Sequence, residues 1–258
     1  MFSESTDPAF PKEVLLNIRI EVVPFLLAAL GAGLLLALLC RLLKSSKKGA
    51  ALAGGIPAVI LVAYFLYFFR DPPRTAPRDK TAVVAAADGK IASITELDAG
   101  TFAALAARAG LEGMDLATLT GARVTRISIY LSLFDVHVNR APIACRSRFL
   151  GYFPGRHFFT IQEKSSDHNQ HNAILMYNEQ TTCLVNQIVG PVCRRVVYWP
   201  AHDAEVELQM GERIGMMKFG SRLDLYFPSD DITVLCTVAD RVRAGETIIG
   251  RLGRAESE

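Results

Sequence analysis

The chain has 258 residues, of which 50% are hydrophobic and 21% are charged, and its formal net charge is +2. This length gives room for one or two domains with a substantial core, and the apolar share exceeds that of a typical soluble domain. So small a net charge, without a basic run interleaved with aromatic residues, argues against a nucleic-acid-binding protein.

Two uncharged apolar runs occupy the N-terminal part of the chain, at residues 22–40 and 49–69. At about 1.5 Å per residue, each can roughly cross a ~30 Å hydrocarbon layer. The second run ends in aromatic residues, which suit the headgroup level of a bilayer. The short basic loop between the runs, residues 41–48, makes a membrane-associated helical hairpin the natural prediction.

Two alternatives exist for these runs. A cleaved signal peptide is disfavoured, because the basic segment before the first run is poor and a second apolar run follows at once. Helices lying flat in the interface are disfavoured because both runs are apolar all round. The count of basic residues leans slightly toward both ends of the hairpin, and hence the chain that follows it, lying on the cytoplasmic side of the cell membrane.

After residue 69 the composition changes abruptly, and Pro72, Pro73 and Pro77 make a stiff, non-helical exit. Turn residues then separate short strand patterns. These lie at residues 82–86, 123–132, 173–177, 183–189, 194–198, 214–219, 223–227 and 247–249. One helix is predicted over 98–109, and segments 206–215 and 240–250 resemble paired hairpins of a barrel-sandwich type. We therefore expect an α+β, mostly β catalytic domain over 76–258, preceded by the helical hairpin and exit linker over 1–75.

Four local sequences are candidates for chemistry: residues 87–90, 134–142, 164–172 and 218–226. Taken singly, each has an ordinary explanation. Asp88-Gly89 is a common turn, His137 follows a predicted strand in a polar stretch, and Gly220-Ser221 before a strand is more often a bend than a reaction site.

Taken together, these motifs resemble the phosphatidylserine decarboxylase family in its short, membrane-associated form. The Phe-Gly-Ser-Arg-Leu-Asp sequence at 219–224 is similar to the self-cleavage site of that family. The Asp-Val-His-Val-Asn-Arg sequence at 135–140 is similarly characteristic. The resemblance runs, with the motifs in the same order, from the Phe-Phe-Arg-Asp-Pro exit to residues 242–247.

The resemblance implies that the chain is a zymogen that cuts itself between Gly220 and Ser221. The products are a β chain, 1–220, and an α chain, 221–258, which form a heterodimer. Ser221 becomes a covalent pyruvoyl cofactor. The amine of phosphatidylserine, a membrane lipid, forms a Schiff base with this pyruvoyl, and loss of CO₂ gives phosphatidylethanolamine.

The resemblance also implies residue roles. Asp88 belongs to the acid/base machinery of self-cleavage, and His137 is the candidate for proton transfer. Arg140 and Arg222 could hold the substrate phosphate or carboxylate through forked bonds, or each could equally be a surface residue. Arg140 stands where long-form members have a second histidine, and Arg222 where they have threonine, so the base that activates Ser221 is left open.

No metal is expected. The five cysteines are odd in number and show neither a C-x-x-C pair nor zinc spacing, and are predicted to be small apolar core residues in a reducing compartment. His168 and His171 have the i, i+3 spacing of a ligand pair but lack an apparent third ligand.

Two other functions are compatible with parts of the sequence. A non-catalytic biotinyl or lipoyl carrier, or a membrane adaptor, would explain the hairpin-like segments and Met217-Lys218, but Phe-Gly-Ser follows where a carrier requires methionine. A pyruvoyl decarboxylase for a different amine headgroup also fits the motifs. The sequence leaves the oligomeric state beyond the heterodimer open.

Overall fold

The computed structural model describes residues 17–114, 116–160, 162, 165–191, 196–218 and 220–253. The chain divides into two compact units, the first ending at Pro73 and the second beginning at Arg74. This boundary lies two residues from the predicted one. Each unit is described by itself.

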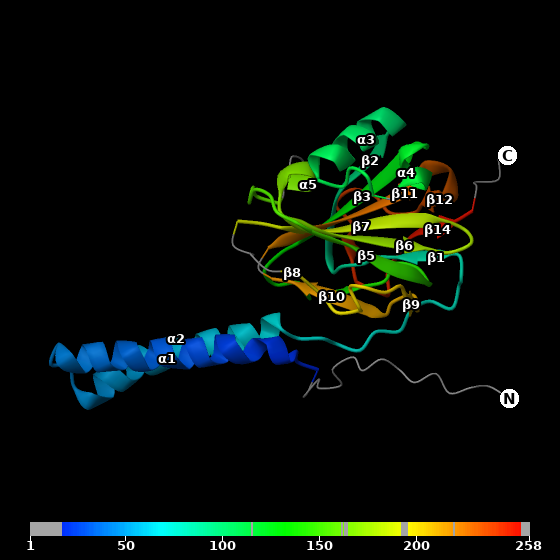
Figure 1. Cartoon of the computed structure of the whole chain (residues 1–258). Coiled ribbons are helices and arrows are strands. Elements are labelled where there is room, and N and C mark those ends of the chain that lie inside the picture. Colours follow the sequence, from blue (N-terminus) through cyan, green and yellow to red (C-terminus); the bar gives the residue numbers. More distant parts are fainter. Residues whose placement is uncertain are drawn as a thin grey trace. The chain divides into compact units, whose positions relative to one another are not determined.

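The first unit is a helical hairpin (Figure 1). A short 3-10 turn, η1 (Ile20–Val22), leads into α1 (Val23–Leu42), and α2 (Lys47–Phe68) returns alongside it. The Ser46 side chain caps α2 by accepting a hydrogen bond from the Gly49 amide at 3.0 Å. The helices approach closely at glycines, because a Cβ on Gly33 would lie 2.6 Å from the Ala58 Cβ, and one on Gly54 would overlap the Gly33 carbonyl.

Both helices are long and apolar enough to cross a membrane. The candidate spans are Ile20–Leu42 and Lys47–Phe68, of 23 and 22 residues. Their outer surfaces expose leucines such as Leu27 and Leu34, at 65% and 63%. Large contiguous apolar surface is rare on soluble proteins. The predicted helical hairpin is therefore confirmed, whereas complete crossing of a bilayer stays a prediction.

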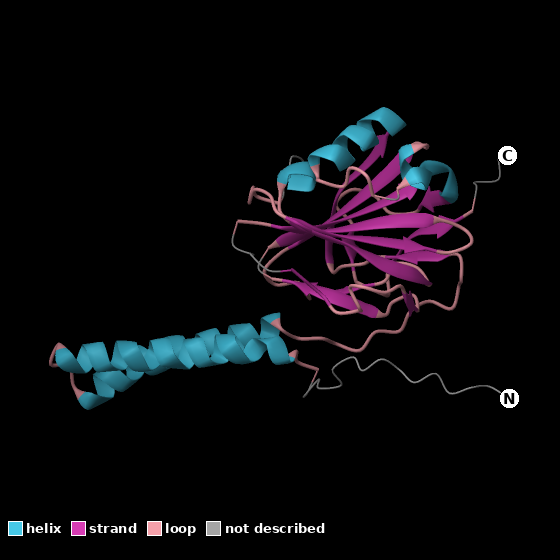
Figure 2. Ribbon diagram, viewed as in Figure 1, coloured by secondary structure: helices cyan, strands magenta, loops and turns pink. Residues whose placement is uncertain are grey.

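The second unit contains an eight-stranded antiparallel sheet and two sheets of three strands (Figure 2). The order in the large sheet is β13 (Arg241–Val242), β2 (Gly89–Leu97), β3 (Val124–Leu131), β11 (Ser221–Pro228), β7 (Thr182–Val189), β6 (His171–Tyr177), β5 (Cys145–Phe153) and β9 (Val206–Leu208). One small sheet orders β1 (Ala82–Val84), β14 (Ile248–Leu252) and β12 (Ile232–Val234). The other orders β4 (Val138–Arg140), β10 (Arg213–Met217) and β8 (Val196–Tyr198).

The large sheet is covered on both faces. Helices α3 (Ala99–Arg108), α4 (Ala117–Thr120) and α5 (Ser165–His168) lie on the face that we call outer (Figure 1), and η2 (Ser229–Asp231) follows β11. Phe102 and Leu119 of these helices pack there with Tyr226. The small sheets cover the inner face, where Leu223 and Ile214 belong to the main core. Successive residues of β11 therefore point into different cores.

The α+β, mostly β prediction is confirmed, as are most predicted strands. The predicted helix at 98–109 is α3, capped by the Asp98 side chain, which accepts from the Thr101 amide at 2.8 Å. Strands β2, β4, β5 and β12 were not predicted, and β9 and β13 lie within the two segments predicted to be hairpin-like. Residues 194–195, which begin one predicted strand, and residue 219, which ends another, lie outside the described residues.

The hairpin-like segments are a correction. Segment 206–215 forms no hairpin, because β9 pairs with β5 whereas β10 pairs with β4 and β8. In segment 240–250, β13 pairs with β2 while β14 pairs with β1 and β12. Turn residues between two strands thus mark chain reversals here, but the partners come from elsewhere in the chain.

Candidate active site

Ser221 is the first residue of β11 and pairs with Leu131 of β3 and Val189 of β7. It is completely buried, and alternation along β11 places it on the inner face with Leu223. Its Oγ has no hydrogen-bond partner among the described residues. A buried polar atom without a partner is uncommon and calls for an explanation such as a catalytic role.

The backbone before Ser221 is unusual. Gly220 has a φ of 70°, which side-chain-bearing residues rarely adopt. A Cβ on Gly190, the residue after Val189, would lie only 2.6 Å from the Gly220 carbonyl oxygen. Only glycine at position 190 therefore leaves room for the carbonyl of the Gly220–Ser221 peptide bond.

The polar stretch at 164–172 contributes a structural clamp next to this bond. Asn169 is 1% exposed, and its Nδ2 donates to the carbonyls of Phe158 and Val189, each at 2.8 Å. Its Oδ1 accepts from the Phe158 amide at 2.9 Å. Asn169 thereby fixes the loop that carries Thr160, whose methyl group would lie 3.3 Å from a Cβ on Gly190.

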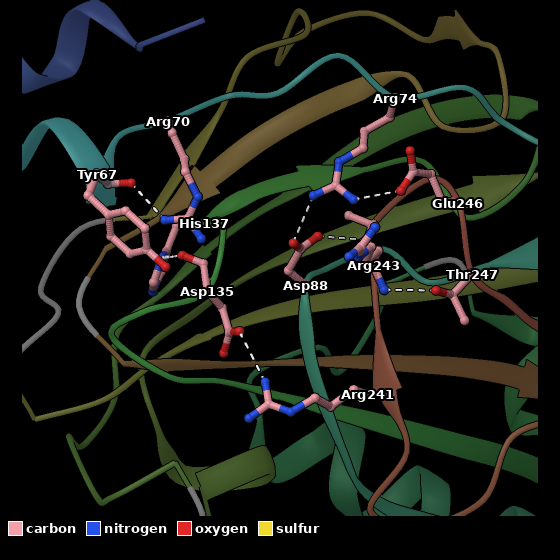
Figure 3. A network of polar contacts seen from close by, with 11 residues as sticks. Tyr67, Arg70, Arg74, Asp88, Asp135, His137, Arg241, Arg243, Glu246 and Thr247 are labelled. Atoms are coloured by element: carbon pink, nitrogen blue, oxygen red, sulfur yellow. Dashed lines mark hydrogen bonds and ion pairs between the residues drawn. The ribbon is translucent and has the colours of Figure 1, made fainter.

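Asp88 lies in the turn between β1 and β2, held on two sides (Figure 3). Its Oδ2 accepts from the Arg74 guanidinium at 2.9 Å, and its Oδ1 accepts from the Ala244 amide at 2.8 Å. Arg74 also donates to Glu246 at 2.7 Å. Burial raises the pKa of Asp88, opposed by the Ala244 hydrogen bond and the Arg74 charge, while the Asp135 carboxylate raises it further.

His137 is buried in the segment between β3 and β4. Its Nδ1 lies 3.0 Å from the Asp135 carbonyl oxygen, and since a carbonyl only accepts, Nδ1 carries the proton. When the ring is neutral, Nε2 is therefore the unprotonated nitrogen and the one that can accept a proton. The His137 carbonyl accepts from the Met217 amide at 3.1 Å, which attaches this segment to the chain just before Ser221.

The end of β3 brings these residues to one end of the large sheet. Leu131 pairs with Ser221 on one side of β3, and a Cβ on Gly89, next to Asp88, would overlap the Tyr130 carbonyl on the other side. His137 follows β3 along the chain. Ser221, the first residue of β11, and Asp88, in the turn before β2, therefore lie on opposite sides of the same end of β3, and each of these strands is about 4.8 Å from β3.

The two arginines proposed as substrate ligands have protein partners. Arg222 points to the outer face, opposite Ser221, and donates to Asp224 at 2.8 Å and to Ser128 at 2.7 Å. Burial alone would raise the pKa of Asp224, but the Arg222 and Arg126 charges and hydrogen bonds outweigh it and lower the pKa. The sequence did not reveal this buried pair.

Arg140 is also buried, and it donates to the Gly211 carbonyl at 2.9 Å. Its side chain packs against Gly245, where a Cβ would lie 2.9 Å from the Arg140 Cδ. Substrate binding by Arg140 or Arg222 stays a prediction, and their contacts indicate at least a structural role for both.

The histidines of the polar stretch form no metal centre that the structure shows. Among the described residues, no group of three or more His, Cys, Asp or Glu side chains is placed to hold a metal ion. His171 is buried, its Nδ1 lies 2.9 Å from the Asn169 carbonyl, and burial chiefly lowers its pKa. Its ring stacks on Phe153 with centroids 5.3 Å apart.

Comparison with known proteins identifies the class of enzyme to which this chain is similar. The chain is 36% identical over 195 residues to a phosphatidylserine decarboxylase proenzyme of Desulfotalea psychrophila, covering 75% of this chain and 82% of the relative. It is 37% identical over 198 residues to that of Erythrobacter litoralis, 76% of each chain. With that of Pelobacter propionicus it shares 34% over 239 residues, 92% of this chain and 97% of the relative. All three are decarboxylases described as proenzymes.

The model of the family described as phosphatidylserine decarboxylase matches residues 61–250. The chain belongs to the phosphatidylserine decarboxylase family. The matched range contains Asp88, His137, Gly220 and Ser221, and the alternative of a biotinyl or lipoyl carrier is not favoured.

Proposed function

We propose that this chain is a phosphatidylserine decarboxylase that cuts itself between Gly220 and Ser221 and converts Ser221 into its pyruvoyl cofactor. One observation carries the proposal. A fully buried serine hydroxyl without a partner among the described residues directly follows a glycine with a φ of 70°. The description of the relatives as proenzymes supports a chain that matures by processing.

The proposed cleavage begins with a rearrangement of the backbone. The Ser221 Oγ attacks the Gly220 carbonyl carbon, the C–N bond breaks, and the amide becomes an ester with a free amine at position 221. Removal of the Ser221 Cα proton then expels the Gly220 carboxylate and leaves dehydroalanine. Water converts this to a ketone and releases ammonia, so all atoms are accounted for.

The serine hydroxyl is a weak nucleophile and needs a base. His137 is the proposed base, because its Nδ1 is fixed as a donor and the opposite ring nitrogen is therefore the one that accepts a proton. Asp88, with its raised pKa, is proposed to exchange protons during elimination at the same sheet end.

The residues present fit a pyruvoyl group at position 221. The site is buried and apolar around Ser221, with Leu131 and Val189 on the paired strands, so bulk water is excluded from the reacting atoms. When formed, the ketone supplies the electron sink for loss of CO₂ from an amino acid headgroup.

The topology supports a two-chain product that stays together. The proposed α chain begins with β11, which lies between β3 and β7 of the proposed β chain. Further on, β13 pairs with β2, and β14 pairs with β1. The cut severs one peptide bond but no strand pairing beyond its own residue, so we expect a stable heterodimer.

Intact mass spectrometry of the purified protein tests the proposal. We expect a fragment of residues 221–258 without a free amino group, together with the fragment 1–220. Ser221→Ala should abolish both the cut and the release of CO₂ from phosphatidylserine. A Ser221→Ala protein that remains one chain and still decarboxylates the lipid would refute the mechanism.

A further inference from the structure

The end of the large sheet that carries Ser221 also exposes large apolar side chains. Ser221 pairs with Leu131 and Val189, so the turn after β3 and the loop fixed at the end of β7 flank it on both sides. The turn after β3 exposes Leu133 at 42% and Phe134 at 66%. The loop after β5, which Asn169 ties to Val189 at the end of β7, exposes Phe159 at 65%. We call these three side chains the apolar rim.

The apolar rim is unusual for the surface of this unit. From Arg74 onward, only seven large hydrophobic side chains among the described residues are exposed, and three of them form the rim. The loop carrying Phe159 is held by the Asn169 clamp, so a fixed backbone keeps the Phe159 side chain exposed. Apolar groups held in water next to a reaction site are typical of an interaction surface.

Basic side chains accompany both parts of the rim. Arg241, 82% exposed, has its guanidinium 3.9 Å from the Asp135 carboxylate in the turn that carries Leu133 and Phe134. Figure 3 shows Arg241 reaching toward Asp135. Arg156 is exposed and lies 5.7 Å from the ring of Phe158, directly before Phe159. Apolar tips with adjacent cations suit the interface of an anionic bilayer.

We propose that the apolar rim, with Arg156 and Arg241, docks the catalytic unit onto an anionic phospholipid bilayer, so that the headgroup reaches Ser221 while the acyl chains stay in the membrane. The inference rests on the proposed function, because it concerns how that site meets its lipid. The chain itself supports a bilayer as the partner, since only residues 69–73 separate the membrane-length helix α2 from this unit. If the apolar rim bound a protein instead, turnover on vesicles would not depend on the charge of the lipid.

The test uses the full chain reconstituted in vesicles of phosphatidylcholine with phosphatidylserine, and in parallel a short-chain, monomeric phosphatidylserine in solution. The variant is Phe134→Asp with Phe159→Asp. We expect it to cut itself normally and to turn over the monomeric substrate at the wild-type rate. On vesicles, kcat/KM should fall about tenfold or more, as expected when the contacts between these aromatic side chains and the bilayer are lost. Leu235→Asp is the matched control, because Leu235 is 53% exposed and follows β12 in a different sheet.

A second variant, Arg156→Gln with Arg241→Gln, should weaken turnover on anionic vesicles most at low ionic strength. Unchanged vesicle turnover in the rim variant would overturn the inference. An equal loss on monomeric and vesicle substrate, or an equal loss in Leu235→Asp, would overturn it as well. These outcomes are separate from failure of the proposed function, which would appear as wild-type protein that is never cut.

Discussion

Replacing Gly190 with alanine should slow self-cleavage without unfolding the protein. The added Cβ would lie 2.6 Å from the Gly220 carbonyl oxygen, whereas ordinary contact begins at 3.4 Å. The carbonyl must therefore move by about 0.8 Å. A misplacement of about 1 Å at reacting atoms can cost about a hundredfold in rate, so we expect cleavage to slow by roughly ten- to a hundredfold.

The assay follows newly translated precursor on a denaturing gel and fits a first-order rate constant. Gly55→Ala is the control, because a Cβ there meets nothing within 4 Å. Thermal unfolding of both variants, compared in an uncut Ser221→Ala background, separates misplacement of the carbonyl from loss of the fold. If Gly190→Ala cuts as fast as Gly55→Ala while remaining folded, the close approach does not position the scissile bond.

Three further predictions concern the polar groups around the site. Arg74→Gln should raise the pKa of Asp88, because it removes a charge that lowers that pKa, and any pH–rate limb that requires ionised Asp88 should move to higher pH. Asp224→Ala should cost about 3–5 kcal/mol in denaturant unfolding of an uncut background, because it strands the buried Arg222 charge, and Arg222→Met with Asp224→Leu should recover most of the loss. Since the pKa of Asp224 is lowered, its stabilisation should be full above the usual carboxyl pKa and disappear as pH falls through the lowered value. Asn169→Ala, which leaves two backbone carbonyls and one amide without their partner, should slow cleavage and lower the unfolding midpoint; an unaffected rate would show that the clamp does not act on the site.

Local patterns were sufficient for the helices and for the most buried strands. The apolar runs behind α1 and α2, and the closely spaced β-branched and apolar residues of β3 and β7, are properties of adjacent residues. In contrast, β5 carries Arg146 and Arg148 and is only partly buried. Its strand character comes from pairing with β6 and β9, which no local pattern specifies.

The motifs predict Ser221, Gly220, Asp88 and His137 as site residues, because reactive residue types occur there in a characteristic order. The motifs could not identify Gly190, because nothing in the local sequence distinguishes it from other glycines. Its importance comes from the register of β7 against β11, which places it next to the Gly220 carbonyl. Asn169, whose bonds join distant segments, was similarly out of reach.

Arg222 illustrates how a strand boundary affects a functional assignment. The predicted strand began at residue 223, which left Arg222 outside it, and Arg222 was proposed as a substrate ligand or a surface residue. In the structure β11 begins at Ser221, and the alternation of side chains along the strand then directs Arg222 to the outer face. There its guanidinium donates hydrogen bonds to Asp224 and Ser128. A two-residue shift of the boundary changes which side of the sheet the guanidinium occupies.

The position of Ser221 at the start of β11 also limits what the proposed reaction costs the fold. Conversion of Ser221 removes the backbone amide nitrogen of that residue. In a central strand, a buried backbone group that loses its hydrogen-bond partner lowers the stability of the fold. Pairing with β3 continues from Arg222 to Pro228 and with β7 from Arg222 to Tyr226, so only the first pair on each side is affected. A reactive serine placed mid-strand would interrupt the ladder on both sides. The first residue of a central strand therefore combines burial of the new ketone with minimal loss of sheet pairing.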